Sequence, residues 1–451
     1  MSEAKKSNLL GFYMCSLTFS FERMAYYAAR WLLVSYVALE AAKGGLGLGK
    51  ASGGLMQSYI TGFTYLAPVL LSFIADRFIG ARYLIPVGLV LMSGGYFIGG
   101  FGGSYASLWI MIVLVSIGTG FFKANLSSLS GTLFATPGEK EASFSTQYSF
   151  VNIGAFFGTF FIGLFAAKYG FLAGFKLVGA VALIGAIWFV FGWSVLKGAG
   201  TQPFKANSEE EKKEEKKETP DRPLAAYEKR RIVSIFIVSG FSVIFWIFWY
   251  LTYLAVYDYA PKYVQLDYSG FTVPTSWFDS LNSFMCIALG PILGLLWLRL
   301  SKRPQGDMSL YKKLAIGLFL LGASFLMLIA AEFQRGVGSS EDHKASIIWI
   351  VAFGVLLSLG EMFFSPLGNS FVAKYAPKRL LSFLMSVWVV ATFFASLSYG
   401  FVYNLTLKFD FMVAYSTIVA ILAVTGVVIL VFEKKLAALV QLQPGEELLE
   451  D

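Results

Sequence analysis

Residues 173–196 read AGFKLVGAVALIGAIWFVFGWSVL, an apolar run that is long enough to cross a bilayer as a helix. The next segment, KGAGTQPFKANSEEEKKEEKKETPDRPLAAYEK at 197–229, is polar and carries blocks of Glu and Lys. It is followed by a second apolar run, IVSIFIVSGFSVIFWIFWYLTYLAVYDYA at 232–260. Because the central segment has too little apolar surface to fold alone, the pattern predicts two membrane-embedded parts joined by a water-exposed linker.

The rest of the chain shows the same preference for lipid. Its 451 residues are 57% hydrophobic and only 14% charged, whereas about a quarter of the residues in a typical soluble domain are charged. Apolar runs of about 20 residues or more indicate membrane-spanning helices, since the strands of a membrane barrel are only about ten residues long. Twelve runs of this kind predict an all-α polytopic membrane protein: 10–39, 54–79, 83–103, 106–134, 144–167, 173–196, 232–260, 278–300, 311–331, 346–373, 380–406 and 411–432.

The twelve expected spans fall into two groups of six. The predicted parts are an N-terminal six-helix bundle, a cytoplasmic charged linker, a C-terminal six-helix bundle and a cytoplasmic acidic tail, at 1–196, 197–229, 230–440 and 441–451. The halves also resemble each other weakly, since GFFKANLSSL at 120–129 can be laid beside MFFSPLGNSF at 362–371. This organisation is similar to the major facilitator fold, whose substrate site lies between the halves near the bilayer midplane.

The basic residues indicate how the chain is oriented. Most of the 36 Lys and Arg residues lie in segments that are cytoplasmic if both termini face the cytoplasm. Because such residues resist translocation, we expect cytoplasmic termini and a plasma membrane location, which in a bacterium is the inner membrane. The same topology accounts for the net charge of +8, so we expect no nucleic-acid partner.

The sequence carries no pattern typical of an enzyme. Cys15 and Cys286 both lie inside expected spans, and no metal-ligand spacing is present. No phosphate-binding Gly-rich loop and no pair of nucleophile and base can be recognised either. We therefore expect no cofactor, no metal and no enzymatic activity.

Ionisable residues inside the spans are the candidates for function, because a charge at the centre of a membrane helix costs about 2.5 kcal/mol or more. In FERMAYYAAR at 21–30, Glu22, Tyr26 and Arg30 share one helical face, and Arg23 and Tyr27 form a neighbouring row. Such a face is expected to line a water-filled cavity or to meet polar groups of another helix. An ion pair that only locks helices together is the structural alternative for Glu22 and Arg23.

Two further charges lie in later spans. Lys123 is in the fourth span and Glu361 is in the tenth, so Arg30 and Lys123 belong to the N-terminal half and Glu361 to the C-terminal half. A ligand that bridges them would need an anionic end and a cationic end. In the loop IADRFIGAR at 74–82, Asp76 can pair with Arg77 or Arg82 and hold the helix ends in one of two arrangements. The alternative is that these charged residues only form a tight loop and have no role in gating.

These residues resemble the motifs of the proton-coupled oligopeptide transporter family over nearly the whole chain. Residues Glu22, Arg23, Tyr26, Tyr27 and Arg30 match the first-span motif E-x-x-E-R-F-x-Y-Y-G-x-R, and FSTQYSFVNIGAFF at 144–157 resembles the fifth-span signature. Lys123 with Asn125, WFDSLN at 277–282 and GEMFFSPLG at 360–368 resemble motifs of the fourth, eighth and tenth spans.

The resemblance implies a role for each matching residue. It implies that Arg30 and Lys123 bind the substrate carboxylate and that Glu361 binds the amino terminus. It further implies that the binding site is lined by Tyr26, Tyr27, Tyr65, Asn152, Trp246 and Asn282. Proton coupling would involve Glu22, Arg23 and Glu361, and gating would involve Asp76 and Arg82.

The chain also departs from the family pattern at acidic positions. Phe19 replaces the first acid of the first-span motif, and Tyr250 stands where many bacterial members have Glu. Two smaller departures are Ala28 and Ala124, and His343, the only histidine, lies in a loop that we expect to be extracellular. These changes predict weakened or rerouted proton coupling, with Glu361 as its main carrier.

The predicted function is proton-linked import of di- and tripeptides or similar small zwitterions by alternating access, with the altered coupling described above. The expected partners are protons, the substrate and the lipid bilayer, and the expected state is a monomer. Two alternatives remain open within transport: a related carrier of a siderophore, an antibiotic or an organic anion, and a facilitator that does not use protons. A receptor or scaffold whose linker recruits a cytoplasmic partner is the alternative outside transport, but it would leave the charges in the spans without a use.

Overall fold

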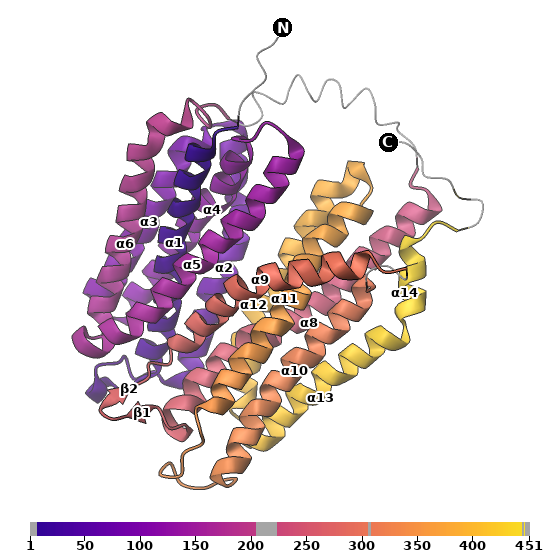
Figure 1. The fold of residues 1–451 in the computed structure, drawn as a ribbon. Coiled ribbons are helices and arrows are strands. Elements are labelled where there is room, and N and C mark those ends of the chain that lie inside the picture. Colours follow the sequence, from indigo (N-terminus) through magenta and orange to yellow (C-terminus); the bar gives the residue numbers. More distant parts are fainter. Residues whose placement is uncertain (1–6, 204–222, 305–307, 444–445, 447–451) are drawn as a thin grey trace. The chain divides into compact units, whose positions relative to one another are not determined.

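The computed structural model describes residues 7–203, 223–304, 308–443 and Glu446. The chain forms two compact units, Met1–Lys212 and Lys213–Asp451, each built almost entirely from helices (Figure 1). The boundary between them falls inside the predicted charged linker. Each unit is described separately below.

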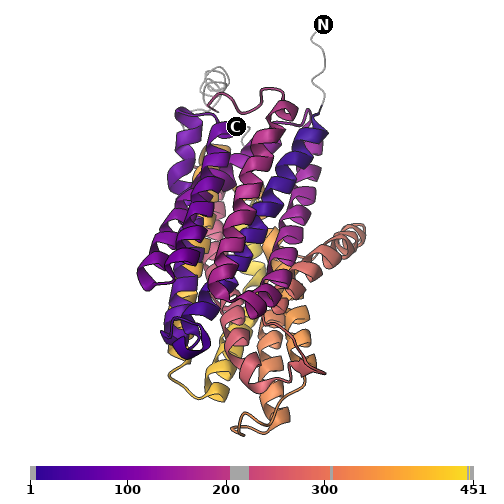
Figure 2. The ribbon, with the colours of Figure 1, turned by 90° about the vertical axis from the view of Figure 1, so that its left-hand side faces the viewer.

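Six long helices make up the N-terminal unit (Figure 2). They are α1 (Leu9–Ala38), α2 (Gly49–Arg77), α3 (Ala81–Gly102), α4 (Tyr105–Gly131), α5 (Pro137–Tyr169) and α6 (Phe171–Phe191). Short 3-10 turns follow α1 and α6, at Ala41–Lys43 (η1) and Gly192–Leu196 (η2). Helix α1 packs against α2, α4, α5 and α6. Its buried charges therefore lie in the interior of this unit.

Glycines allow α5 to approach α1 very closely. A Cβ atom on Gly154 would collide with the backbone of Ser20, and one on Gly158 would collide with the backbone of Met24. The Ser20 hydroxyl also donates a hydrogen bond of 2.7 Å to the carbonyl of Phe150 on α5. Small residues at this spacing let helix backbones meet inside a membrane. The contact fixes α5 beside the charged segment of α1.

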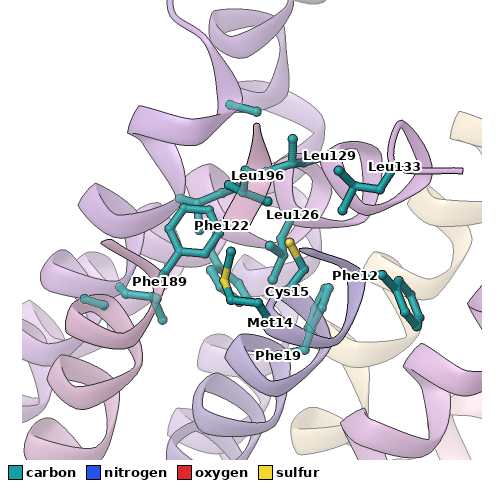
Figure 3. Packing of buried hydrophobic residues seen from close by; sticks show 14 residues of the cluster. Phe12, Met14, Cys15, Phe19, Phe122, Leu126, Leu129, Leu133, Phe189 and Leu196 are labelled. Carbon is teal, nitrogen blue, oxygen red and sulfur yellow. The ribbon is translucent and has the colours of Figure 1, made fainter. Parts of the chain in front are cut away.

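A hydrophobic cluster is buried inside the N-terminal unit (Figure 3). Its core joins α1, α4 and α6 through side chains that include Cys15, Phe19, Phe122, Leu126 and Phe189. The rings of Phe19 and Phe122 meet edge to face with their centroids 5.2 Å apart. Edge-to-face contacts of this kind add about 0.5–1.5 kcal/mol beyond the burial of area.

The C-terminal unit also contains six long helices. They are α8 (Ala226–Tyr263), α9 (Trp277–Ser301), α10 (Leu310–Arg335), α11 (Ile348–Tyr375), α12 (Leu381–Thr406) and α13 (Phe411–Val431), and a 3-10 turn, Lys378–Leu380 (η4), precedes α12. Helix α11 packs against α8, α9, α10 and α12, so it is the central helix that carries Glu361.

Two small elements of this unit were not expected from the sequence. Strands β1 (Asp267–Tyr268) and β2 (Phe271–Thr272) form an antiparallel hairpin between α8 and α9, and α14 (Glu433–Val440) follows α13. The hairpin turns through Ser269 and Gly270, which both have positive φ. The hydropathy scan missed α14 because this helix has one apolar face, on which Leu436 and Val440 are buried, and a charged remainder.

The long helices follow the expected order of twelve spans. Ten of them, among the described residues, are long and apolar enough to cross a membrane, and the two outside this set are α1 and α2. Helix α1 carries the buried side chains of Glu22, Arg23 and Arg30, which lower its hydropathy. Several helices begin earlier than the apolar runs. For example, α5 begins at Pro137, because Thr136 and Glu139 form a capping box there.

The linker boundaries need correction at both ends. Residues 197–203 form turns that pack against the N-terminal unit, where the Arg82 amide donates a 3.0 Å hydrogen bond to the Gly200 carbonyl. Helix α8 begins at Ala226, so 226–229 are helical rather than part of the linker. Residues 204–222 of the predicted linker lie outside the described residues.

Most of the predicted acidic tail, 441–451, also lies outside the described residues. Within the described part, Arg230 at the start of α8 donates hydrogen bonds of 2.9 and 2.5 Å to the carboxylate of Glu446. These hydrogen bonds from Arg230 lower the pKa of Glu446 to about 2, so the pair stays ionised through the physiological range.

Candidate functional site

The charged segment of α1 begins with an ion pair between neighbouring residues. Arg23 donates from Nε and Nη2 to the two carboxylate oxygens of Glu22, each at 2.5 Å. Glu22 is 0% exposed and Arg23 is 7% exposed. The sequence left open whether Glu22 pairs with Arg23 or Arg30, and the structure shows the pair with Arg23. Because the pair is buried, removing one partner would cost about 3–5 kcal/mol.

Aromatic rings extend this charged row along α1. The Arg23 Cζ atom lies 4.7 Å from the centroid of the Tyr26 ring and 5.9 Å from that of Tyr27. The Arg30 Cζ atom lies 5.2 Å from the Tyr27 ring, and Arg30 is buried. Each desolvated contact of a guanidinium with a ring is worth up to about 2 kcal/mol. Tyr27 therefore lies between two guanidinium groups.

Helices α2 and α4 bring two more of the predicted residues to this side of α1. The hydroxyl of Tyr26 lies 3.2 Å from the hydroxyl of Thr64 on α2. The next residue, Tyr65, packs its ring against Lys123 of α4, with 4.5 Å from Nζ to the ring centroid. The structure thus joins Tyr26 and Lys123 through neighbouring residues of α2. Sequence reasoning missed Thr64, because a lone threonine in a span gives no signal.

Asn152 lies on α5, the helix that the glycine contact fixes beside α1. Its side-chain nitrogen donates a 3.0 Å hydrogen bond to the Tyr148 carbonyl of its own helix. Asn125 of α4 behaves in the same way and donates 2.7 Å to the Phe121 carbonyl. Both amides therefore stay within their own helices, where each keeps its carbonyl oxygen as an acceptor.

In the C-terminal unit, Glu361 is at the centre of a polar cluster. The amide nitrogen of Asn282 on α9 donates 2.9 Å to Oε2 of Glu361 and lies 3.1 Å from the Ser358 hydroxyl. The Cys286 sulfur lies 3.7 Å from the same carboxylate oxygen. Glu361 is 8% exposed. The structure thus brings together two predicted residues, Asn282 and Glu361. It adds Ser358, which lies one turn before Glu361 on α11, and Cys286, which lies one turn after Asn282 on α9.

Trp246 of α8 lies among aromatic rings near this cluster. Its ring is 6.4 Å from that of Phe364, which is one turn along α11 from Glu361. It is also 5.3 Å from the ring of Trp249. The buried Nε1 of Trp246 has no hydrogen-bond partner among the residues that the structure describes. This donor is available to a polar group of a ligand.

The two positions without the family's acids are occupied by packed rings. Phe19 belongs to the hydrophobic cluster of Figure 3 and meets Phe122. Tyr250 is stacked on Tyr399 of α12, with 5.2 Å between the ring centroids. Packed aromatic rings therefore occupy both positions.

The predicted gating residues are described only in part. The side chain of Asp76 lies outside the described residues. Arg82 donates a 2.8 Å hydrogen bond to the Trp193 carbonyl in η2, and its guanidinium carbon lies 4.8 Å from the Trp193 ring. Arg82 thus fastens the start of α3 to the end of the N-terminal unit.

Two helical units with buried ionisable residues on long apolar helices define a polytopic membrane transporter. Within the described residues, no group of three or more His, Cys, Asp or Glu side chains could hold a metal ion. The family model described as "POT family" matches residues 82–208 and 211–420. Since these ranges cover well over half of the sequence, the chain belongs to the POT family.

Individual relatives extend over most of the chain. The uncharacterized transporter YclF of Bacillus subtilis (strain 168) is 27% identical over 433 residues, which are 84% of this chain and 84% of YclF. The dipeptide and tripeptide permease A of Escherichia coli (strain K12) is 26% identical over 432 residues, which are 87% of this chain and 83% of the permease.

Solved structures confirm the predicted fold class. The peptide transporter POT in complex with sulfate has a TM-score of 0.84 at 24% identity and covers 95% of both chains. A mutant of the same transporter in complex with alafosfalin has a TM-score of 0.84 at 25% identity, again over 95% of both chains. The chain therefore has the all-α major facilitator fold of this family, with twelve membrane helices, and the predicted family membership is confirmed.

Proposed function

We propose that the chain imports di- and tripeptides, or similar small zwitterions, by alternating access. In this proposal both termini face the cytoplasm, the protein acts as a monomer in the plasma membrane, and transport is linked to protons. The distribution of charge carries the proposal: the N-terminal unit holds the buried Arg30 on α1 and the half-buried Lys123 on α4, and the C-terminal unit holds the buried Glu361 on α11. Buried charges of opposite sign match the two ends of a zwitterion.

Each end of the substrate has a proposed binding group. The carboxylate binds Arg30 and Lys123, which pack on the rings of Tyr27 and Tyr65. The amino group binds Glu361, which Asn282 holds in place. The remaining predicted residues, Tyr26, Asn152 and Trp246, contact the rest of the peptide. Named relatives support this substrate class, since one is a dipeptide and tripeptide permease and another was solved with alafosfalin.

Proton linkage is assigned to Glu361, with Glu22 and Arg23 in a supporting role. The Glu22 carboxylate already accepts two hydrogen bonds from Arg23. Glu361 accepts a hydrogen bond from the neutral amide of Asn282. A proton on Glu361 would change its contact with the substrate amine, and protonation can thereby bias the conformational equilibrium. Asp76 and Arg82 are proposed to act as a cytoplasmic gate.

The decisive experiment compares a dipeptide with its C-terminal amide. The amide would leave Arg30 and Lys123 desolvated without a counter-charge, so its affinity should fall by about tenfold or more. Binding is measured on purified wild type, on Lys123→Gln and on the control Lys176→Gln, whose lysine packs on Phe101 of the same unit. The control should discriminate like wild type, and Lys123→Gln should discriminate less. Equal affinity of wild type for dipeptide and amide would exclude this peptide-binding mode.

A second candidate is a carrier of a modified peptide or a non-peptide solute, either with or without proton coupling. The packed rings of Phe19 and Tyr250 favour it, because they remove two acids that the family motif contains. Uptake into proteoliposomes with and without an inward proton gradient separates the cases, using wild type and Glu361→Gln. If the Glu361→Gln variant still accumulates substrate against its gradient, the proposed role of Glu361 is wrong. Downhill exchange whose rate does not depend on pH would identify a facilitator.

A further inference from the structure

Polar side chains form a stripe along one face of α9. Asp279, Asn282 and Cys286 follow one another at helical spacing, three and four residues apart, so they share a face. Asn282 and Cys286 contact the Glu361 carboxylate of α11. Asp279 lies one turn earlier on the same face, at the end of α9 that the predicted topology places outside. The stripe therefore connects Glu361 with a second carboxylate.

Asp279 is buried and holds α9 to α8. It is 4% exposed, and its Oδ2 accepts a hydrogen bond from the hydroxyl of Tyr257 on α8. A carboxylate in the first turn of a helix stabilises that helix by about 0.3–1 kcal/mol through the helix dipole, whether the carboxylate is exposed or buried. Burying a carboxylate costs more than this gain. Stabilisation of α9 therefore does not by itself explain why Asp279 is buried.

The neighbouring residues of α8 provide an internal comparison. Asp258 accepts a 3.2 Å hydrogen bond from Tyr403 of α12, and Tyr259 donates 2.9 Å to Glu332 of α10. Three consecutive residues of α8 thus form hydrogen bonds with three different helices, and each hydrogen bond joins a tyrosine hydroxyl to a carboxylate. Only the pair of Tyr257 and Asp279 lies on the face that leads to Glu361. Asp258 is a matched control for Asp279, since it makes the same kind of bond on another side of α8.

The ionisable groups on the elements that pack against α9 near Asp279 can be named from the sequence. Helix α9 packs against α11 and α8. Between Ile348 and Glu361, the sequence of α11 contains no ionisable side chain, so Glu361 is its contribution. At this end, α8 carries the ionisable residues Tyr253, Tyr257, Asp258, Tyr259, Lys262 and Tyr263, and the hairpin carries Asp267 and Tyr268.

We propose that Asp279 is a second proton-binding carboxylate of the transport cycle, acting in addition to Glu361. A proton from the outer solution converts the Asp279 carboxylate to the neutral acid, and no other bond is formed or broken. The charge-assisted hydrogen bond from Tyr257 then becomes a neutral one of about half the strength, which loosens α9 from α8. Release of the proton restores the tie. This inference rests on the proposed proton-linked transport.

The transport experiment uses the full chain in proteoliposomes with the membrane potential held at zero. A one-unit inward proton gradient multiplies the accumulation ratio by about ten for each coupled proton. Asp279→Asn should therefore lower the ratio for a dipeptide by about tenfold, whereas Asp258→Asn should leave it unchanged. Tyr257→Phe keeps the carboxylate but removes its donor, so the outside pH of half-maximal uptake should differ from that of wild type. An unchanged ratio in Asp279→Asn would overturn the inference.

A second measurement does not depend on the substrate. Trp277 lies two residues from Asp279, so tryptophan fluorescence of the purified protein can follow its titration from pH 8 to pH 4. A transition in wild type and in Asp258→Asn that is lost in monodisperse Asp279→Asn would support the inference, and a transition that persists would overturn it. Exchange of peptide for peptide by wild type tests the proposed function separately, because it needs no proton gradient.

Discussion

Phe19 is a packed aromatic residue of the first helix, at a position where the motif that this helix resembles has an acid. The ring fills a place in the hydrophobic cluster and meets Phe122, the neighbour of Lys123 on α4. A carboxylate at this place would face apolar side chains instead of the guanidinium groups farther along α1. The substitution is therefore a change in packing as well as a loss of charge. The stacking of Tyr250 on Tyr399 is the matching change in the C-terminal unit.

We predict that Phe19→Glu destabilises the protein rather than restoring an acidic function. Burying a carboxylate in apolar surroundings costs several kcal/mol, and the aromatic contact with Phe122 is lost as well. Thermal unfolding of the purified protein should show a clear decrease in Tm. Phe19→Leu is the control, and it should lose much less because it keeps an apolar side chain. A Glu variant as stable as wild type would show that position 19 reaches water.

Sequence reasoning identified the charged residues but could not assign all of their contacts. The sequence left two possible partners for Glu22, Arg23 and Arg30, and the side-chain conformations in the structure show the pair with Arg23. Asn282 was recognised by its motif. Its bond to Glu361 depends on how α9 packs on α11, which one sequence does not contain.

At the scale of elements, a very close helix contact lies where the charges are. Gly154 and Gly158 of α5 meet the backbone of α1 at Ser20 and Met24, on either side of Glu22 and Arg23. Close backbone contact leaves little room for water, so the ion pair is held between packed helices. The contact also keeps Asn152 at a fixed distance from the charged row.

We predict that Gly154→Ala lowers the stability of the N-terminal unit, because the added methyl group would collide with the Ser20 backbone. Overpacking of this kind costs about 1–3 kcal/mol. Gly240→Ala is the matched control: this exposed glycine of α8 has nothing within 4 Å of an added Cβ. The control should be neutral or gain up to about 1 kcal/mol from helix propensity. Equal Tm values for both variants would argue against a tight contact between α1 and α5.

The hydropathy pattern predicted the existence of the long helices better than their ends. Helix α8 starts at Ala226 and α5 starts at Pro137, in both cases before the apolar run begins. Helices can extend into water where caps satisfy their first amide groups, and hydropathy does not report this extension. The β1–β2 hairpin and α14 were missed because they are short and polar.

At the scale of the whole molecule, the repeat in the sequence has a counterpart in the fold. The two aligned segments lie on α4 and α11, the fourth long helix of each unit, and these helices carry Lys123 and Glu361. Corresponding helices of the two halves thus present opposite charges. A single sequence could predict this pairing because both charges interrupt apolar runs. It could not predict their surroundings, which are the ring of Tyr65 for Lys123 and a polar cluster for Glu361.

The orientation of the chain gives the last prediction. Lys and Arg resist translocation, so the loop between α10 and α11 should face outside and the chain after α14 should face the cytoplasm. Both native cysteines are buried, so an impermeant maleimide should label wild type poorly on intact cells. With the native cysteines replaced by Ala, Glu341→Cys in the exposed loop should be labelled on intact cells. Gln443→Cys should be labelled only after the membrane is permeabilised. The reverse pattern would place both termini outside and would also reverse the direction in which the proposed outer proton site at Asp279 faces.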